Sequence, residues 1–242
     1  MSESPSKPNP EVTPADHLTS RAVRSFVVRN GRMTTAQQRA LDELLPVYGV
    51  EFSDIPVVPE QHYPDSQPLW VEVGFGNGDA MLSIAGQFPD VNYLGIEVHA
   101  PGVGHALAGI QSNGLENVRV IRHDAFEVLA SLPAASISRL LVFFPDPWPK
   151  KRHHKRRILQ QEFLDIASGA LTADGVIHCA TDWQEYAEAM MEVLDQQTWL
   201  KNSAGAGEYA NKPDYRPATR FEQRGRRLGH QVFDLVHQHI GT

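Results

Sequence analysis

Residues 70–88 read WVEVGFGNGDAMLSIAGQF, and this stretch decides the fold that the sequence predicts. The apolar residues 70–73 predict a strand, the glycine-rich residues 74–78 predict a turn, and residues 79–88 predict a helix. A strand, a glycine turn and a helix in this order are typical of the first βαβ unit of an α/β sheet. Glycines in such a turn let the backbone approach a ligand, and the N-terminus of the helix faces that ligand.

The glycine spacing distinguishes two classes of ligand. The dinucleotide fingerprint G-x-G-x-x-G would need a glycine at position 79, where the chain has Asp79. The chain instead has an acid, Glu72, followed by G-x-G-x-G at Gly74, Gly76 and Gly78. This form resembles the first motif of class I S-adenosylmethionine-dependent methyltransferases, whose ligand has no pyrophosphate.

Four further apolar segments predict strands, and an acidic residue lies near the carboxyl end of each. The strands are residues 92–98, 118–122, 140–144 and 176–180, and the acids are Glu97, Asp124, Asp146 and Asp182. Because ligands of an open α/β sheet bind outside the carboxyl ends of its strands, these acids are candidates for one site. A carboxylate at Glu97 can accept hydrogen bonds from both hydroxyls of a ribose.

Two of these acids also have a simple structural interpretation. Asp124 is placed to meet an adenine amino group or to cap the predicted helix 125–130. Asp182 lies at the carboxyl end of a predicted strand, where it is a candidate for the site, or it caps the predicted helix 183–194, with Glu185 completing a capping box. The sequence leaves both alternatives open for each residue.

The stretch 143–157, FFPDPWPKKRHHKRR, joins a rigid turn to a strongly basic run. Three prolines within five residues exclude a helix and a central strand, because each proline fixes φ and removes a hydrogen-bond donor. Asp146 is therefore expected on a stiff turn just beyond the strand that ends near Phe144. A fixed carboxylate beside a cationic run indicates chemistry on a polyanion.

The charge of the chain is unevenly distributed. The formal net charge is −7, but residues 21–32, 150–157 and 216–227 hold four, six and five of the 22 Lys and Arg residues. The last window includes Arg216. A basic surface on an acidic body is typical of a protein that binds nucleic acid phosphates.

Length and composition limit the class of protein. A chain of 242 residues with 41% hydrophobic residues suits one α/β domain with short appendages. The single cysteine, Cys179, excludes an internal disulfide, and the polar start MSESPSKPNP does not resemble a secretory signal, so a cytoplasmic protein without membrane spans is expected. Residues 1–20 are expected to be a disordered tail and residues 21–33 a basic arm.

The remaining pattern predicts element boundaries. Residues 36–45 predict a helix, capped by Thr34 or Thr35 and ended by Pro46, and residues 158–171 predict another. Residues 232–240 predict a final edge strand with His237 and His239 on one face. Two histidines without a third ligand do not make a metal site, so no metal is expected.

Taken together, these motifs resemble one family, the bacterial tRNA (guanine-N7-)-methyltransferases. The resemblance extends from about Arg24 to the C-terminus, and its most specific parts are PDPW joined to the basic run and the ending TRFEQRGRRLGH at residues 219–230. It implies a Rossmann-like class I methyltransferase fold. This fold has a mostly parallel seven-stranded sheet, an antiparallel C-terminal strand and helices on both faces, in a single domain over residues 34–242.

The resemblance also implies residue roles. S-adenosylmethionine would be the cofactor and the tRNA variable loop the substrate, with a monomer favoured. Asp146 would be the active-site acid. The residues implied to contact cofactor are Glu72, Gly74, Gly76, Gly78, Glu97, Asp124 and Asp146; those for substrate are Lys150, Asp182, Thr219, Arg220, Phe221 and Glu222; those for RNA are Arg152, His153, His154, Lys155, Arg156 and Arg157. At Arg220 the family often carries lysine.

Three other functions fit part of the pattern. A nicotinamide oxidoreductase would leave Asp79 and the basic stretches unexplained, and a non-catalytic RNA-binding protein would leave the acids at the strand ends unexplained. A methyltransferase acting on another RNA base or an exocyclic amine would more often carry a D-P-P-[YF]-like turn than P-D-P-W.

Guanine N7 carries no proton, so the predicted reaction needs no general base.

Overall fold

The computed structural model describes residues 33–53, 57–218, 222, 229 and 231–241. The predicted tail 1–20 and all of the predicted arm 21–33 except Met33 lie outside the described residues. Residues 219–221, which are expected to contact substrate, also lie outside them. Within the described ranges, no helix is long and apolar enough to cross a lipid bilayer.

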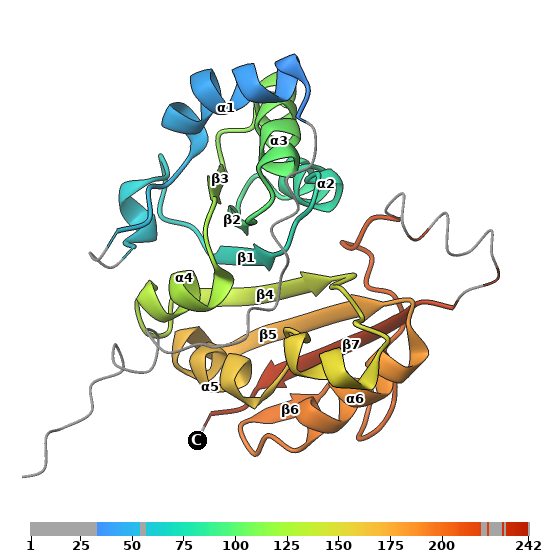
Figure 1. Cartoon of the computed structure of the whole chain (residues 1–242). Coiled ribbons are helices and arrows are strands. Elements are labelled where there is room, and N and C mark those ends of the chain that lie inside the picture. The colour runs from blue at the N-terminus through green and yellow to red at the C-terminus, as the bar shows by residue number, and fades with distance from the viewer. Residues whose placement is uncertain (1–32, 54–56, 219–221, 223–228, 230, 242) are drawn as a thin grey trace, which may run out of the picture.

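In the described part of the chain, seven strands form one sheet in the order β3-β2-β1-β4-β5-β7-β6 (Figure 1). The strands are β1 (Leu69–Val73), β2 (Asn92–Ile96), β3 (Val118–Ile121), β4 (Ile137–Phe143), β5 (Leu171–Thr181), β6 (Leu200–Asn202) and β7 (Phe233–His239). Strands β1 to β5 pair in parallel with one another, whereas β7 is antiparallel to both β5 and β6. The predicted fold class is confirmed.

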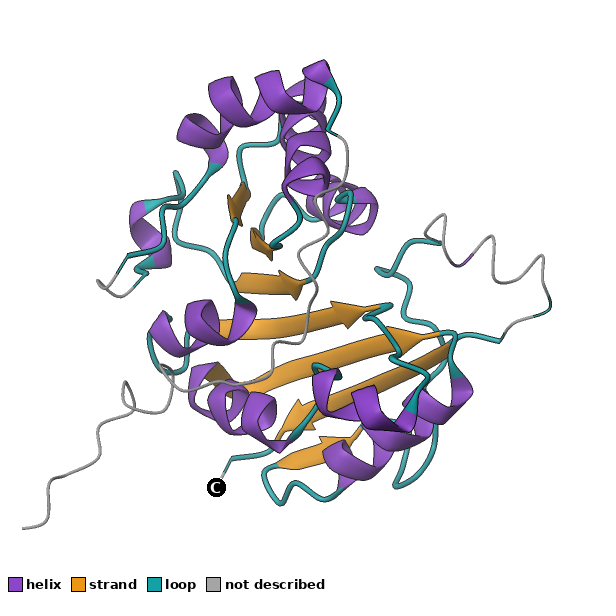
Figure 2. Cartoon of the chain, in the orientation of Figure 1, coloured by secondary structure: helices purple, strands orange, loops and turns teal. Residues whose placement is uncertain are grey.

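Helices cover both faces of the sheet (Figure 2). Among the residues that the structure describes, they include α1 (Thr35–Tyr48), α2 (Asp79–Gln87), α3 (Ala100–Asn113), α4 (Ala125–Ser131), α5 (Gln161–Ala170) and α6 (Gln184–Asp195), with the short 3-10 helices η2 (Pro59–Gln61) and η3 (Lys151–Arg156). Side chains of a strand alternate between its two faces. Val71 and Val73 therefore join one apolar core with α4, α5 and α6, and Trp70 joins a second core with α1, α2 and α3.

Helix α3 is rich in glycine because other backbone segments pass close to it. A Cβ atom on Gly102 would lie 2.3 Å from the carbonyl oxygen of Gly76 in the glycine turn. A Cβ atom on Gly104 would lie 2.6 Å from the carbonyl oxygen of Gln37 in α1. Glycine at these two positions lets α3 contact the glycine turn and α1 at the same time.

Helix α1 corrects one predicted boundary. Thr34 is the N-cap and forms a capping box with Gln37, but the prediction that Pro46 ends the helix is wrong, since α1 includes Pro46 and continues to Tyr48. Pro46 lies in the last turn, where its missing N–H removes a single backbone hydrogen bond. The amide of Gly49 donates to the carbonyl of Leu45 and closes the helix end.

Helix α5 and strand β5 meet earlier than predicted. The predicted helix 158–171 is α5, which ends at Ala170, and β5 begins at once with Leu171 paired to Ile137. The pairing then shifts, so that the next pair joins Arg139 to Val176. Asp174, with φ of +64°, lies in this irregular section of the strand and does not follow a helix end.

The last strand is not at the edge of the sheet. β7 lies between β5 and β6, because the three-residue strand β6 pairs along its outer side. His237 and His239 have separate partners, since the His237 ring bonds Asp195 at 2.7 Å and the His239 ring bonds the carbonyl of Thr172 at 2.8 Å. The prediction of an edge strand is therefore wrong.

Candidate active site

The glycine turn between β1 and α2 needs glycine at three positions. Gly74, Gly76 and Gly78 have φ of +74°, +60° and +84°, a region that other residues rarely adopt. A Cβ atom on Gly74 or Gly76 would have no atom within 4 Å, so the turn faces open space. The backbone can therefore come close to a ligand, as the sequence pattern predicted.

Glu97, one residue beyond β2, holds this turn in place. Its Oε2 accepts a hydrogen bond of 2.9 Å from the amide of Gly76, and its Oε1 accepts from the amides of Val98 and His99 at 2.8 and 3.0 Å. Three amide contacts fix the direction of the carboxylate. A carboxylate has about four lone-pair positions, so Glu97 retains the capacity to accept from a ligand hydroxyl.

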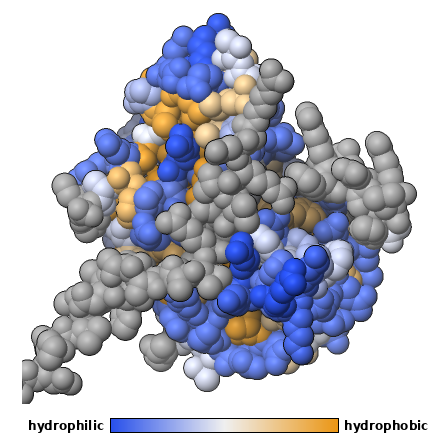
Figure 3. Space-filling model, viewed as in Figure 1, coloured by the Kyte–Doolittle hydropathy of each residue, from blue (hydrophilic) through white to orange (hydrophobic). Residues whose placement is uncertain are grey.

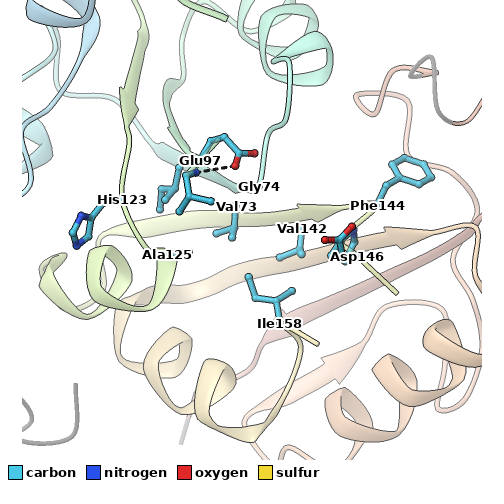
Figure 4. A pocket seen from close by; sticks show the side chains of 12 residues that line it. Val73, Gly74, Glu97, His123, Ala125, Val142, Phe144, Asp146 and Ile158 are labelled. Carbon is cyan, nitrogen blue, oxygen red and sulfur yellow. Dashed lines mark hydrogen bonds between the residues drawn. The ribbon is translucent and has the colours of Figure 1, made fainter. Parts of the chain in front are cut away.

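A hollow of about 220 Å³ lies outside the carboxyl ends of the central strands (Figure 4). Its walls come from the glycine turn, the ends of β2 and β3, and the turn after β4. Figure 4 draws these side chains around the hollow, with Glu97 after β2, His123 after β3 and Asp146 after β4. Strands that meet at one edge have thus brought distant residues of the chain together, as the sheet topology requires.

A second hollow, of about 180 Å³, adjoins the first. It is lined by Glu72, Phe75, Asn77 and Phe143, and it shares Gly74 and Phe144 with the first hollow. The two hollows therefore meet at the glycine turn. This shape suits an elongated ligand with a ribose near Glu97 and a second polar group near Glu72.

Glu72 is a buried carboxylate, 2% exposed, at the floor of the second hollow. The hydroxyl of Tyr93 donates a hydrogen bond of 2.6 Å to its Oε2. Burial raises the pKa of Glu72 to about 7; the Tyr93 hydrogen bond acts in the opposite direction, and the charge of Glu97 adds to the increase. The carboxylate can therefore change its protonation state near neutral pH.

Asp124 caps α4, which is one of the two roles that the sequence left open for it. Its Oδ1 accepts a hydrogen bond of 3.0 Å from the amide of Phe126. Its neighbours on both sides, His123 and Ala125, line the first hollow. Capping is confirmed for Asp124, and a cofactor contact through its other oxygen stays a prediction.

The turn that carries Asp146 has a strained backbone. Phe144 and Trp148 have φ of +50° and +45°, a left-handed conformation that costs non-glycine residues energy. The amide of Phe144 donates to the carbonyl of Ala180 in β5 at 2.7 Å, which ties the start of the turn to the sheet. The Asp146 side chain is exposed and lies at the edge of the first hollow.

The basic run after this turn forms η3 and lies largely at the surface. Lys150, Lys151, Arg152 and Lys155 are exposed, and His153, His154 and Arg156 are partly exposed. Figure 3 shows strongly hydrophilic residues over the part of the surface where η3 lies in Figure 1. A cationic surface therefore adjoins the turn of Asp146.

Arg157, the last residue of the basic run, differs from the others. It is 5% exposed, and its Nε donates a hydrogen bond of 2.9 Å to the carbonyl of Pro147. Its Nη2 donates to Glu185 at 3.1 Å. This side chain is therefore buried and bonded within the protein, unlike its exposed neighbours in the run, and direct binding of RNA by Arg157 stays a prediction.

Comparison with known proteins identifies the family. A family model described as "Putative methyltransferase" matches residues 66–235. The tRNA (guanine-N(7)-)-methyltransferase of Neisseria gonorrhoeae is 48% identical over 242 residues, which is 100% of both chains. That of Leifsonia xyli is 48% identical over 216 residues, which cover 89% of this chain and 95% of the relative. This chain belongs to the tRNA (guanine-N7-)-methyltransferase family. The family that the sequence predicted is confirmed.

Solved structures of more distant methyltransferases share the fold. The 16S rRNA methyltransferase KamB has a TM-score of 0.55 at 17% identity, covering 78% of this chain and 95% of that chain. A 16S rRNA (adenine(1408)-N(1))-methyltransferase from Catenulisporales acidiphilia, in a structure with S-adenosylmethionine, has a TM-score of 0.52 at 12% identity. It covers 81% of this chain and 96% of that chain. At these identities the similarity concerns the fold alone.

Within this tRNA (guanine-N7-)-methyltransferase fold, Asp182 lies at the carboxyl end of β5, next to the strand that leads to Asp146. The N-cap of α6 is Trp183, and its amide donates to Thr181 Oγ1 at 3.2 Å. The prediction that Asp182 is the N-cap is therefore wrong. Glu185 does not complete a capping box either, because its Oε1 contacts Arg157 and His154.

One residue of the motif 219–222, which is expected to contact substrate, lies within the described part of the chain. Thr219, Arg220 and Phe221 lie outside the described residues, whereas Glu222 is described and is 0% exposed. Its Oε2 is 2.5 Å from Nη1 of Arg216, and its Oε1 is 3.4 Å from Nζ of Lys212. Glu222 itself is therefore held in the protein interior by Arg216 and Lys212.

Arg216 belongs to a buried ionic cluster that sequence analysis missed. The sequence placed Arg216 in a basic surface window, but it is 1% exposed. It forms two hydrogen bonds to Asp234 in β7, at 2.6 and 2.8 Å, and Asp234 also accepts from His178 at 2.8 Å. Burial raises the pKa of Asp234, but the contacts of His178 and Arg216 outweigh this effect and lower it below its usual value. These partners lie 18 and 56 residues apart, so no local pattern indicated the cluster.

Proposed function

We propose that this protein transfers the methyl group of S-adenosylmethionine to N7 of a guanine in the variable loop of tRNA. The observation that carries the proposal is that one edge of the sheet combines the glycine turn, Glu97, a hollow and Asp146 on a rigid turn. The cationic η3 follows that turn directly. A relative named tRNA (guanine-N(7)-)-methyltransferase matches the chain over its full length.

The residues around the two hollows fit S-adenosylmethionine. Glu97 would accept from a ribose hydroxyl, because its carboxylate lines the first hollow and retains an acceptor position beside its three amide contacts. Glu72 would accept from the ammonium group of the methionine part, in the second hollow. Gly74, Gly76 and Gly78 would let the backbone approach the ligand, and Asp124 would contact the adenine. When bound there, S-adenosylmethionine supplies an electrophilic methyl group on a sulfonium.

Asp146 would stabilise the guanine as it becomes positively charged. Guanine N7 carries no proton, so the protein has to orient the base and not to deprotonate it. Orientation can lower a barrier by several kcal/mol. A fixed carboxylate beside the base can accept from its N–H groups and offset the developing positive charge. The rigid turn of Asp146 provides such a fixed carboxylate.

The remaining residues would bind the tRNA. The exposed Lys150, Arg152 and Lys155, with the partly exposed His153, His154 and Arg156, would contact phosphates. Lys150 and Asp182, with residues 219–221, would hold the guanine, whereas Glu222 is buried and bonded to Arg216, so its part in substrate binding would be indirect. The position of Asp182 supports this role, because it follows β5, the strand next to β4, and lies at the same edge of the sheet as Asp146.

The test is methylation of unmodified tRNA transcripts with labelled S-adenosylmethionine, followed by treatment that cleaves RNA at 7-methylguanosine. Cleavage at one guanine in the variable loop is the expected result, and a transcript with adenine at that position should take up no label. Label without cleavage would indicate another base or an exocyclic amine. Binding of S-adenosylmethionine without any labelled RNA would indicate another acceptor.

A further inference from the structure

Arg157 connects two segments of the active site that are distant in the sequence. Its Nε donates to the carbonyl of Pro147 at 2.9 Å, in the turn that carries Asp146. Its Nη2 donates to Glu185 Oε1 at 3.1 Å, in the first turn of α6. Its guanidinium carbon lies 4.7 Å from the centre of the Tyr186 ring. One buried side chain thus contacts the segment after β4 and the segment after β5.

The turn of Asp146 needs such an external contact. Pro145, Pro147 and Pro149 have no N–H, so they cannot donate hydrogen bonds that would fix the turn from within. Phe144 and Trp148 are both left-handed, and a strained backbone persists only where the surrounding structure holds it. The Arg157 hydrogen bond reaches the carbonyl of Pro147, the residue that follows Asp146.

The far end of the connection is also fixed. Glu185 Oε1 lies 3.4 Å from the His154 ring as well as 3.1 Å from Arg157. The hydroxyl of Tyr186 accepts a hydrogen bond of 3.3 Å from the amide of Leu159, so α6 also holds the chain that follows Arg157. Glu185 lies three residues after Asp182. The geometry therefore sets the position of the Asp146 turn relative to the segment of Asp182.

We propose that Arg157 is a positioning residue that holds Asp146 in its catalytic place, and that it is not one of the RNA-binding residues of the basic run. The proposal rests on the proposed function for the role of Asp146. A planar guanidinium suits this position because it donates in two directions while stacking on a ring. An ammonium group has no planar face, so Arg157→Lys is not a conservative change here.

The experiment compares Arg157→Lys with Arg156→Gln, a neighbour in the same run that lies over the Trp148 ring. For R157K we expect kcat at saturating tRNA and S-adenosylmethionine to fall about 100-fold, since a misplacement of 1 Å can have this effect. Its tRNA affinity and the salt dependence of that affinity should stay within about twofold, because the lysine keeps the charge. For R156Q, which removes a positive charge, we expect tRNA affinity to fall and its dependence on salt concentration to become shallower.

Hydrogen–deuterium exchange provides a readout that does not need activity. In R157K the amide of Phe144, which donates to the carbonyl of Ala180 at the start of the turn, should exchange about tenfold faster than in the wild type, because a hydrogen bond that holds the turn is lost. Glu185→Gln, which weakens the other end of the connection, should raise the same exchange rate and lower kcat. If R157K does not fold, the exchange rate and the kcat of E185Q test the proposal in its place.

Two results would overturn the proposal. One is an R157K variant, or E185Q in its place, with unchanged exchange and unchanged kcat. The other is an Arg157→Gln variant that loses tRNA affinity and salt dependence as R156Q does while its kcat and exchange rates stay normal. Failure of the proposed function is a separate result: the wild type would methylate no tRNA, while the exchange measurement would still test the connection.

Discussion

The hydroxyl of Tyr93, in the middle of β2, donates a hydrogen bond of 2.6 Å to Oε2 of Glu72 in β1. Glu72 is a buried acid that lines the second hollow, and Tyr93 is its polar side-chain partner within the described part of the chain. Burial raises its pKa to about 7, whereas the reference value of the group is 4.5. The charge that would bind the cofactor is therefore unfavourable for the folded protein without cofactor.

The first prediction concerns stability and pH. Between about pH 4.5 and 7, folded Glu72 holds a proton that the unfolded chain has released, so the free energy of unfolding should fall as pH rises. The loss is on the order of 3 kcal/mol. Glu72→Gln should remove this dependence and be more stable than the wild type at pH 8, yet bind S-adenosylmethionine more weakly. Calorimetry from pH 5 to 8 measures the stability.

Glu116→Gln is the control for this prediction, because Glu116 is exposed and lies outside both hollows. It should leave the pH dependence of stability as in the wild type. If the stabilities of the wild type and of E72Q rose in parallel from pH 5 to 7, the pH dependence could not be assigned to the raised pKa of Glu72.

The second prediction concerns the glycine turn. Gly76→Ala should lower stability by roughly 1–2 kcal/mol, because φ is +60° and alanine is strained there. The added methyl group meets no protein atom within 4 Å, so it would occupy the open space on the ligand side and weaken S-adenosylmethionine binding. Denaturant unfolding and calorimetric titration measure the two effects.

Gly169→Ala in α5 is the matched control. A Cβ atom on Gly169 also meets no atom within 4 Å, but Gly169 is helical, so alanine should stabilise the protein slightly. Equal effects of the two substitutions would show that backbone strain at Gly76 is absent.

The third prediction concerns Asp146, the proposed active-site acid. Asp146→Asn keeps the size of the side chain and removes its charge, and we expect kcat to fall roughly 100-fold, the scale of lost electrostatic stabilisation. Asp146 is exposed, so the stability of the protein should change by less than about 0.5 kcal/mol. Single-turnover methylation with excess enzyme measures the chemical step. An unchanged rate would refute the role of Asp146.

The fourth prediction concerns the buried cluster. Arg216→Gln leaves the carboxylates of Glu222 and Asp234 buried with less compensation, and should lower stability by about 3–5 kcal/mol. Because Glu222 belongs to the motif 219–222 that is proposed to contact substrate, tRNA affinity should fall as well. Lys201→Gln, at an exposed position of β6, should change stability by less than about 0.5 kcal/mol. An R216Q variant as stable as the wild type would mean that the Arg216 ionic cluster contributes nothing to the free energy of unfolding.

Local patterns in the sequence were sufficient for the part of the site built on strand ends. The glycine turn, Glu97, Asp124 and Asp146 each follow a short apolar strand, and the sheet order brings these ends together. Side-chain period and turn composition carry this information within a few residues. The family resemblance added the ligands, which no spacing could provide.

The sequence did not distinguish buried from exposed arginines. Arg157 and Arg216 both stand among other basic residues, and each is buried because of partners elsewhere in the chain. Glu185 lies 28 residues after Arg157, and Asp234 lies 18 residues after Arg216. Such pairs depend on how helices and strands pack, and a charge count along one segment contains no information about them.

The close packing of α3 has a consequence for how the protein can vary. Gly102 and Gly104 lie against the backbone carbonyls of Gly76 and Gln37, so a single added methyl group on either would collide with main-chain atoms that cannot rotate away. In a saturation library, these positions should therefore be as intolerant as catalytic residues although neither carries a functional group. Substitutions there would report on the shape of the glycine turn, because α3 transmits any displacement to it directly.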